Sequence, residues 1–326
     1  MSESLSIMRR VIRIGERSMG VTLPREWLNL LGIDLGSLVK ISIIGNSIVI
    51  SPVSEETTII RELSVDTKDL DTPDKISKII IASYLEGLDR IVSQGDRIVI
   101  RRAFNEIFSK LPGIVLFESG KELEFRVTVD ENIMNIESIT KTLTNSSLMM
   151  FDLLNKYLET KDKSYLEQLF ILDDDLDRLH FMGIRLIKKT LALSPSDAGD
   201  LLIAIKSLEH VGDSLDRSAR MLQRISIDEK CASVASEILK LTRAYYEESL
   251  DVYHKRDFLK AIQLLNNRQS YMDSLIDLLT KSTCSNELLG FLHEALNIIS
   301  IAAEISELTV SRFVREKITK KTSKSE

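Results

Sequence analysis

Acidic side chains interrupt an otherwise apolar helical segment at residues 169–193. Leucines and one glycine recur in this segment at spacings of three and four, which is typical of a helix that faces a core. This row consists of Leu169, Leu172, Leu176, Leu179, Gly183 and Leu186. The neighbouring strip of the same helix is apolar at both ends and carries Asp173, Asp177 and His180 in its middle. Carboxylates beside a core are costly unless a charge pairs with them, so the strip predicts a site for a metal ion or a partner.

A second acidic helix follows after a short break. Glu209, Asp213 and Asp216 lie at i, i+4 and i+7, which places them on one helical face. The segment 193–197 between the two helices contains a proline and candidate N-cap residues, and so short a connection makes the helices antiparallel neighbours. Their acidic strips can then face each other. We therefore expect a divalent or iron-type cation, which hard carboxylate oxygens favour, and its ligands would be Asp173, Asp177, Glu209 and Asp213.

Two other interpretations of these acids stay open. They could form a docking surface for a basic partner without any metal, or they could be a solvated face that Lys206 and Arg220 neutralise. The pair Asp177 and His180 invites comparison with di-iron bundles, but Gly212 lies three residues after Glu209, where such a centre needs a second histidine. The sequence therefore argues against an oxidase centre. The remaining histidines, which show no ligand-like pairing and are expected at surface or half-buried positions, are His210, His254 and His293.

The two acidic stretches, Asp173–His180 and Leu208–Asp213, resemble the motifs of the PhoU family of phosphate-signalling proteins. The resemblance extends from about residue 133 to the C-terminus. It implies a three-helix bundle that is repeated twice, and acidic motifs that bind metal clusters in some members. It also implies a role in repressing phosphate uptake or phosphate-regulon signalling, through contact with a phosphate transporter or its sensor.

The C-terminal region repeats itself, since residues 163–166 correspond to residues 256–259 at an offset of 93 residues. The second copy lacks both aspartates of the first acidic strip and carries Asn266 and Ser270 instead. The positions of Glu209, Asp213 and Asp216 are taken, with a small shift, by Ser300, Glu304 and Glu307. Two stacked units bury a core that neither would bury alone. We expect at most one well-formed metal site, in the first unit.

Residues 8–53 predict a separate β-rich unit. Its expected elements are strands at 8–14 and 19–23, a short helix at 25–31 opened by Pro24, and a hairpin of strands 38–44 and 48–51 around Gly45-Asn46. The run Ser18–Trp27, followed by Leu31-Gly32-Ile33 and Gly36, resembles the SpoVT/AbrB swapped-hairpin family. Members of that family are intertwined dimers, and many are DNA-binding regulators of transition-state or antitoxin type. The resemblance implies a homodimer.

Positive charge gathers at the start of the chain. Up to residue 25, five arginines stand against two glutamates. Arginines on a dimeric β-platform can pair with phosphates and guanine edges, so we expect DNA contacts from Arg9, Arg10, Arg13, Arg17 and Arg25. The alternative is that these arginines are solvated residues of a module that only dimerises. The short helix carries Leu28 and Asn29 where DNA binders of the family often have basic residues.

Residues 55–131 predict a small α/β subdomain that connects the two recognisable parts. Its expected elements are strands at 57–63, 97–101, 114–117 and 123–129, a helix opened by Thr72-Pro73-Asp74, a short helix at 103–111, and turns at Gly95-Asp96 and Gly120-Lys121. The first helix bears Ile76, Ile79, Ile80 and Tyr84. No catalytic constellation occurs in this segment, which favours a role as spacer or docking element for a partner.

Bulk properties limit the class of protein. The chain has 326 residues, 44% hydrophobic residues and a net charge of −6, which argues against a protein that coats nucleic acid with its whole surface. Its two cysteines, Cys231 and Cys284, lack the spacing of metal ligands and are expected to be small buried or surface thiols. No signal peptide occurs, and no apolar run approaches the roughly 20 residues of a membrane span, so we expect a cytoplasmic protein.

The sequence thus predicts a mainly α fold, with two PhoU-like three-helix bundles preceded by a small AbrB-like swapped-hairpin module and an α/β connecting subdomain. The expected domains are 1–54 for DNA binding or dimerisation, 55–131 as connector, 132–225 and 226–320 as helical repeats, and 321–326 as tail. We expect no enzyme, since no nucleophile–base pair or phosphate-binding loop occurs. The expected function is a dimeric transcriptional regulator of phosphate homeostasis. The alternative is an AbrB-type transcription factor whose bundle senses a metal or another ligand unrelated to phosphate.

Overall fold

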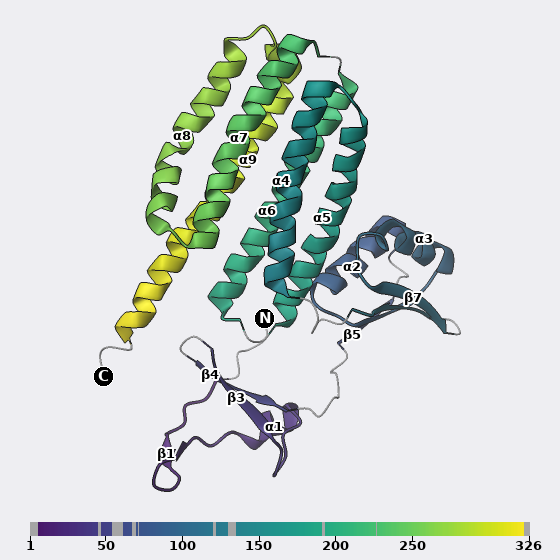
Figure 1. The fold of residues 1–326 in the computed structure, drawn as a ribbon. Coiled ribbons are helices and arrows are strands. Elements are labelled where there is room, and N and C mark those ends of the chain that lie inside the picture. Colours follow the sequence, from purple (N-terminus) through teal and green to yellow (C-terminus); the bar gives the residue numbers. More distant parts are fainter. Residues whose placement is uncertain are drawn as a thin grey trace. The chain divides into compact units, whose positions relative to one another are not determined.

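The computed structural model of the chain describes residues 6–44, 47–53, 61–66, 70, 72–119, 122–129, 135–190, 193–225 and 227–322. The chain divides into two compact units, residues 1–59 and residues 60–326. Each unit is described by itself below, and Figure 1 gives the labels of the helices and strands.

The first unit consists of two small antiparallel hairpins and one short helix. Strands β1 (Ile12–Arg13) and β2 (Met19–Gly20) pair over only two residues each, so both are shorter than their sequence pattern predicts. Helix α1 (Arg25–Leu30) follows Pro24, and strands β3 (Val39–Ile44) and β4 (Ser47–Pro52) pair along their whole length. The predicted Gly45-Asn46 turn lies outside the described residues.

Apolar side chains of this first unit remain largely uncovered. Ile33 is its one buried hydrophobic residue among those described. On the strands, by contrast, Ile41 is 65% exposed, Ile43 82% and Ile48 72%. A unit of this size buries too little apolar surface to be stable alone, so these faces need a partner surface.

The second unit begins with the α/β subdomain. Its elements are β5 (Glu62–Asp66), α2 (Pro73–Leu85), β6 (Arg90–Gln94), α3 (Arg97–Ile107), β7 (Ile114–Ser119) and β8 (Glu122–Val127). The sheet order is β5-β6-β8-β7, in which only β5 and β6 are parallel. A small core of its own contains Tyr84, Ile100 and Phe125, all fully buried.

Two predictions for this subdomain need correction. Residues 97–101 form the first turns of α3 and not a strand, because the Asp96 side chain accepts hydrogen bonds from the backbone N–H groups of Ile98 and Val99 and so caps a helix. The strand of this region is β6, Arg90–Gln94, which the sequence pattern did not predict. The N-terminal part of the predicted strand 57–63, up to residue 60, and the predicted turn at 120–121 lie outside the described residues.

The remainder of the second unit is helical and consists of two consecutive three-helix units. The first comprises α4 (Ile136–Thr160), α5 (Ser164–Lys189) and α6 (Pro195–Arg224), and the second α7 (Glu229–Lys255), α8 (Phe258–Thr280) and α9 (Ser285–Thr322). Helix α4 begins at residue 136 and α7 at residue 229, which reproduces the offset of 93 residues. The predicted mainly α fold with repeated bundles is confirmed.

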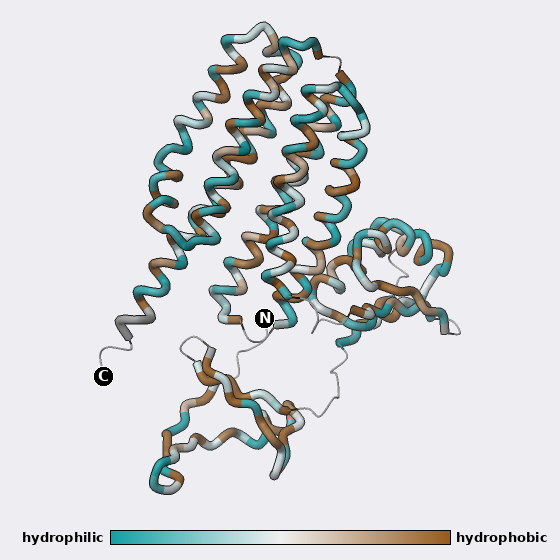
Figure 2. The backbone as a smooth tube through the Cα atoms, viewed as in Figure 1, coloured by the Kyte–Doolittle hydropathy of each residue, from teal (hydrophilic) through white to brown (hydrophobic). Residues whose placement is uncertain are grey.

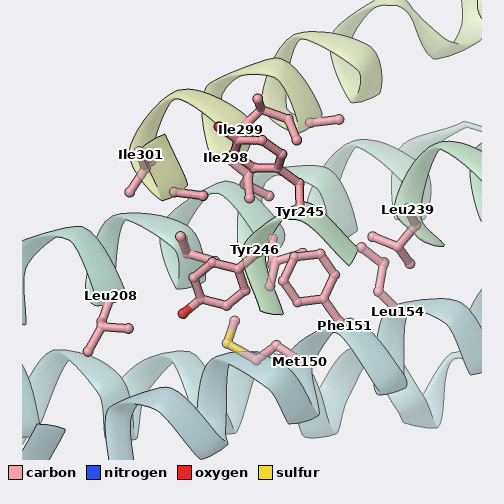
Figure 3. Packing of buried hydrophobic residues seen from close by; sticks show 14 of the residues in the cluster. Met150, Phe151, Leu154, Leu208, Leu239, Tyr245, Tyr246, Ile298, Ile299 and Ile301 are labelled. Atoms are coloured by element: carbon pink, nitrogen blue, oxygen red, sulfur yellow. The ribbon is translucent and has the colours of Figure 1, made fainter. Parts of the chain in front are cut away.

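One hydrophobic core runs through both helical units. Figure 2 shows apolar and polar residues alternating along each helix of the bundle, as expected for helices that bury one face. In Figure 3, Phe151 of α4 lies beside Tyr246 of α7, and their ring centroids are 5.8 Å apart. The Tyr246 hydroxyl shares a 2.8 Å hydrogen bond with Ser147, which satisfies its buried polar group. The second repeat is therefore packed against the first.

Helix α9 differs from one expectation. Its segment Asn286–Ile318 is long and apolar enough to cross a membrane by length and composition, since an 18-residue window in it has a mean hydropathy of 1.5, and this finding qualifies the expectation that no apolar run approaches the length of a membrane span. However, 61% of this window is buried, and α9 packs against α6, α7 and α8. A central bundle helix meets the same criterion, and burial in the core accounts for its hydropathy.

The two cysteines, which the sequence predicts to be thiols, are instead bonded to each other. Cys231, at the start of α7, and Cys284, just before α9, form a disulfide with a Cα–Cα distance of 5.5 Å. They are 53 residues apart in sequence, but the α7–α8 hairpin brings its two ends together. The α7–α8 hairpin thus brings the two cysteines together, and their spacing in the sequence does not reveal this contact.

Candidate metal centre

Three carboxylates meet where α5 passes α6. Asp177, Glu209 and Asp213 each offer an oxygen, and these oxygens lie within 4.8 Å of one another. Gly212 permits the close approach of the two helices, because a Cβ atom built there would lie 2.6 Å from Cδ1 of Leu176. The leucine row thus holds the helices together while the acidic strips beside it face each other.

Asp173 lies one helical turn before Asp177 on the same seam. Its Oδ1 atom is 3.7 Å from the position that a Cβ on Gly212 would take. The structure therefore places all four predicted ligands at the α5–α6 seam, with Asp177, Glu209 and Asp213 as the tight group. Asp216 is instead paired with Arg220, at 2.6 Å.

Burial and mutual repulsion favour the protonated form of two carboxyl groups at the seam, Asp173 and Glu209. Burial, followed by the charges of Asp216 and Asp177, raises the pKa of Asp173 to about 7. Burial, followed by the charge of Asp213, raises the pKa of Glu209 to about 8. Since a cation would relieve both the burial cost and the repulsion, the cluster is electrostatically prepared for one.

His180 lies beside one member of the cluster, Glu209. The residue is only 9% exposed, and burial lowers the pKa of its imidazole to about 4, so the ring is neutral near pH 7. Its Nδ1 atom lies 3.4 Å from Oε2 of Glu209, yet neither atom makes a hydrogen bond within the described part of the chain. A neutral imidazole is a good metal ligand. The three clustered carboxylates form a donor set that suits a divalent cation, and the imidazole lies next to it, against Glu209.

A cation that lies on neither acidic helix contacts the cluster. Lys110, in the turn after α3, places its Nζ atom 3.3 Å from Oδ2 of Asp177. The two cations that were considered act differently. Arg220 pairs with Asp216. The charge of Lys206 offsets part of the rise in the pKa of Glu209. Lys110 and Asp177 are 67 residues apart, so no local pattern could have shown the contact.

The corresponding place in the second repeat has no such cluster among the described residues. Asn266, Ser270, Glu304 and Glu307 are exposed. Ser300 instead accepts a 2.9 Å hydrogen bond from the guanidinium of Arg268. The acidic seam is therefore a feature of the first repeat.

The arginines proposed for DNA contacts all lie in the first unit. Arg9, Arg10, Arg13, Arg17 and Arg25 are exposed. Arg13 also stabilises the β1–β2 turn, because its guanidinium donates hydrogen bonds to the backbone oxygens of Gly15 and Glu16, both at 3.1 Å. The side chains of the other four make no such hydrogen bond within the described part of the chain and are open to a ligand.

Comparisons with known proteins give two domain matches. Residues 140–222 match the family model of the PhoU domain, and residues 12–58 match that of MazE, described as antidote-toxin recognition, bacterial antitoxin. Among solved structures, the phosphate transport system regulatory protein PhoU from Streptococcus pneumoniae matches with 16% identity and a TM-score of 0.36, over 57% of this chain and 97% of that chain. A search of curated proteins found no match.

Proposed function

We propose that this protein, which carries a MazE-type domain at 12–58 and a PhoU domain at 140–222, is a dimeric DNA-binding regulator of phosphate uptake in the cytoplasm. The observation that carries the proposal is the PhoU domain, since it contains the acidic seam of α5 and α6. Both matched domains are regulatory, and we propose no enzymatic activity.

Dimerisation is supported by the uncovered apolar strands of the first unit. Ile43 and Ile48 face each other across the β3–β4 hairpin and are both mostly exposed. A second copy of the same hairpin would present the same apolar residues, and a two-fold interface uses one patch twice. The homodimer is thus the simplest cover for these strands.

DNA binding is supported by the exposed arginines of that unit. Their charge stands out in a chain whose net charge is −6. In a dimer, the five arginines would be doubled and could contact the phosphates of one duplex. The module would then link the regulator to its target genes.

Cation binding is supported by the donor set of Asp177, Glu209 and Asp213, with Asp173 and His180 beside it. Hard carboxylate oxygens favour a divalent or iron-type ion. The bound ion would favour the ionised form of Asp173 and Glu209, whose pKa values are raised, and would tie α5 to α6. The same acidic face would also serve for contact with a component of a phosphate transporter or its sensor.

The decisive experiment is a deletion of the gene, followed by measurement of phosphate uptake and of transcripts in high and low phosphate. We expect uptake in high phosphate to rise, because a repressor is lost, and expression of the wild-type chain should restore it. A chain with Asp173, Asp177, Glu209 and Asp213 changed to Asn or Gln should restore it poorly. Normal uptake and normal phosphate-gene transcripts in the deletion strain would favour a transcription factor that senses another ligand.

A further inference from the structure

Lys110 is the point where the α/β subdomain contacts the acidic seam. Its ammonium lies 3.3 Å from Asp177, one of the three carboxylates whose oxygens cluster within 4.8 Å. The lysine side chain is 49% exposed, whereas the Asp177 side chain is 21% exposed. The ammonium thus reaches a half-buried carboxylate from the solvent side and has room to leave it.

The ammonium and a metal ion would compete for the same oxygen. A divalent ion held by Asp177, Glu209 and Asp213 would have to sit within a few ångströms of the Asp177 carboxylate, because metal–oxygen bonds are about 2.0–2.6 Å long. Two cations that share one carboxylate repel each other strongly in a partly buried site. The Asp177 carboxylate therefore cannot bind the Lys110 ammonium and the metal ion at the same time without weakening one of the two contacts.

Other groups around the cluster do not share this position. Arg217 approaches Asp213 at 3.5 Å, but its guanidinium is held by Glu294 at 3.0 Å. His180, nine-tenths buried and without a hydrogen bond to Nδ1, faces Glu209 and remains available as a ligand. Lys110 is therefore the cation most directly opposed to an incoming ion.

The subdomain itself is fastened to α5 at another place. Arg185 of α5 is fully buried and donates hydrogen bonds to the backbone oxygens of Tyr84 and Leu88, at 3.1 and 2.7 Å, and to the carboxylate of Asp89 at 2.7 Å. Lys189 also pairs with Asp89 at 2.7 Å. Release of Lys110 would consequently free only the end of α3 and leave the subdomain docked.

We propose that Lys110 is a built-in counter-cation of the α5–α6 seam, which occupies Asp177 in the metal-free protein and is displaced when a divalent ion binds. The inference rests on the proposed cation site. Lys110 sets the affinity of that site, and its displacement reports the state of the site to the end of α3. The middle subdomain thereby becomes a part of the sensor and is more than a spacer.

The test is titration of the full-length protein with Mn²⁺, with free Mn²⁺ followed by electron paramagnetic resonance. Lys110→Met should bind Mn²⁺ about tenfold more tightly than the wild type, because the competing charge is gone. The matched control is Lys78→Met, which removes an equally charged but exposed lysine of the same subdomain, paired with Asp74 on α2. This control should bind as the wild type does.

A second measurement follows the end of α3 by hydrogen exchange. In the wild type, Mn²⁺ should increase exchange of the amides around Lys110, which bond to the Ile107 oxygen. In Lys110→Met, the exchange of these amides should not respond to Mn²⁺. The expected result in both measurements supports the inference.

The outcomes separate this inference from the proposed site. If the wild type binds Mn²⁺, Asp177→Asn with Asp213→Asn abolishes binding, and Lys110→Met binds as the wild type does, the site stands and the role of Lys110 is refuted. If neither the wild type nor Lys110→Met binds Mn²⁺, the cation site itself is refuted, and the inference falls with it.

Discussion

Glu209 and His180 are the least satisfied pair of side chains at the α5–α6 seam. Their facing atoms are buried, 3.4 Å apart, and lack hydrogen bonds within the described part of the chain. Buried polar atoms in such a state cost free energy, typically about 1–3 kcal/mol each. A protein that kept this pair only for its fold would gain by replacing it with apolar side chains, and the pair therefore suits the cation that we propose for the seam.

At the residue scale, replacing Asp177 and Asp213 together by Asn should remove bound metal from the purified protein. The change keeps the size of both side chains and removes two charged oxygen ligands. Elemental analysis of the protein checks this result. The control is Asp174→Asn with Asp175→Asn, which changes two exposed acids on the same helix. Metal that stayed in the first variant would refute the assignment.

The pH dependence of stability gives a second residue-scale prediction. In metal-free protein the raised pKa values of Asp173 (about 7) and Glu209 (about 8) mean that the folded state keeps protons that the unfolded state releases near pH 4. Their contribution to stability is fully present below about pH 4, declines as the pH rises above that value, and is lost once the pH has passed 7 for Asp173 and 8 for Glu209. His180 has the opposite sign, but its contribution changes only below pH 6.5, the ordinary pKa of the ring.

The melting temperature in chelator should therefore fall between pH 6.5 and 8.5 more steeply for the wild type than for Asp173→Asn with Glu209→Gln. Mn²⁺ should reverse the trend, since binding releases the protons and so strengthens with pH. Thermal melts at several pH values check both statements. Equal slopes for the two proteins in chelator would contradict the raised pKa values.

At the scale of elements, the exposed arginines of the first unit lie before β1, on the β1–β2 hairpin and at the start of α1. Replacing Arg9, Arg17 or Arg25 by Ala should weaken DNA binding and reduce the slope of log affinity against log salt by about one unit for each lost phosphate contact. Fluorescence anisotropy with duplex DNA from the gene's own upstream region measures the slope. Arg178→Ala, at an exposed arginine of α5, is the control. Identical slopes throughout would leave the first unit as a dimerisation module.

The sequence predicts an element well where the contacts that determine it are local in the chain, and poorly where they join distant residues. The periodic leucines and acids of α5 and α6 placed the seam correctly, because helical spacing is a local property. The strand proposed at 97–101 failed because the Ile98-Val99-Ile100 run suits either element, and the cap by Asp96 decided for a helix. Lys110 and the disulfide escaped notice since each depends on residues more than 50 positions apart that only the tertiary fold brings together.

At the scale of the whole molecule, the dimer should depend on the first unit. A chain that begins at Arg61 retains the core of the second unit, and it lacks the exposed strands of the first unit that require cover. Light scattering should show a mass near that of one chain for this truncation and near that of two chains for the full protein. An unchanged dimer after truncation would place the contact in the second unit.

Arg185 has a consequence for how such chains can be recombined. Its guanidinium lies buried in the bundle and takes its acceptors from Tyr84, Leu88 and Asp89 of the α/β subdomain. A chimera that replaced residues 1–131 by those of another protein would leave this guanidinium buried without its acceptors. Uncompensated buried charges typically cost about 3–5 kcal/mol. A junction near residue 60 separates the two compact units and leaves those acceptors in place. The first unit, residues 1–59, is therefore exchangeable between relatives, whereas the α/β subdomain has to be kept together with the first helical repeat.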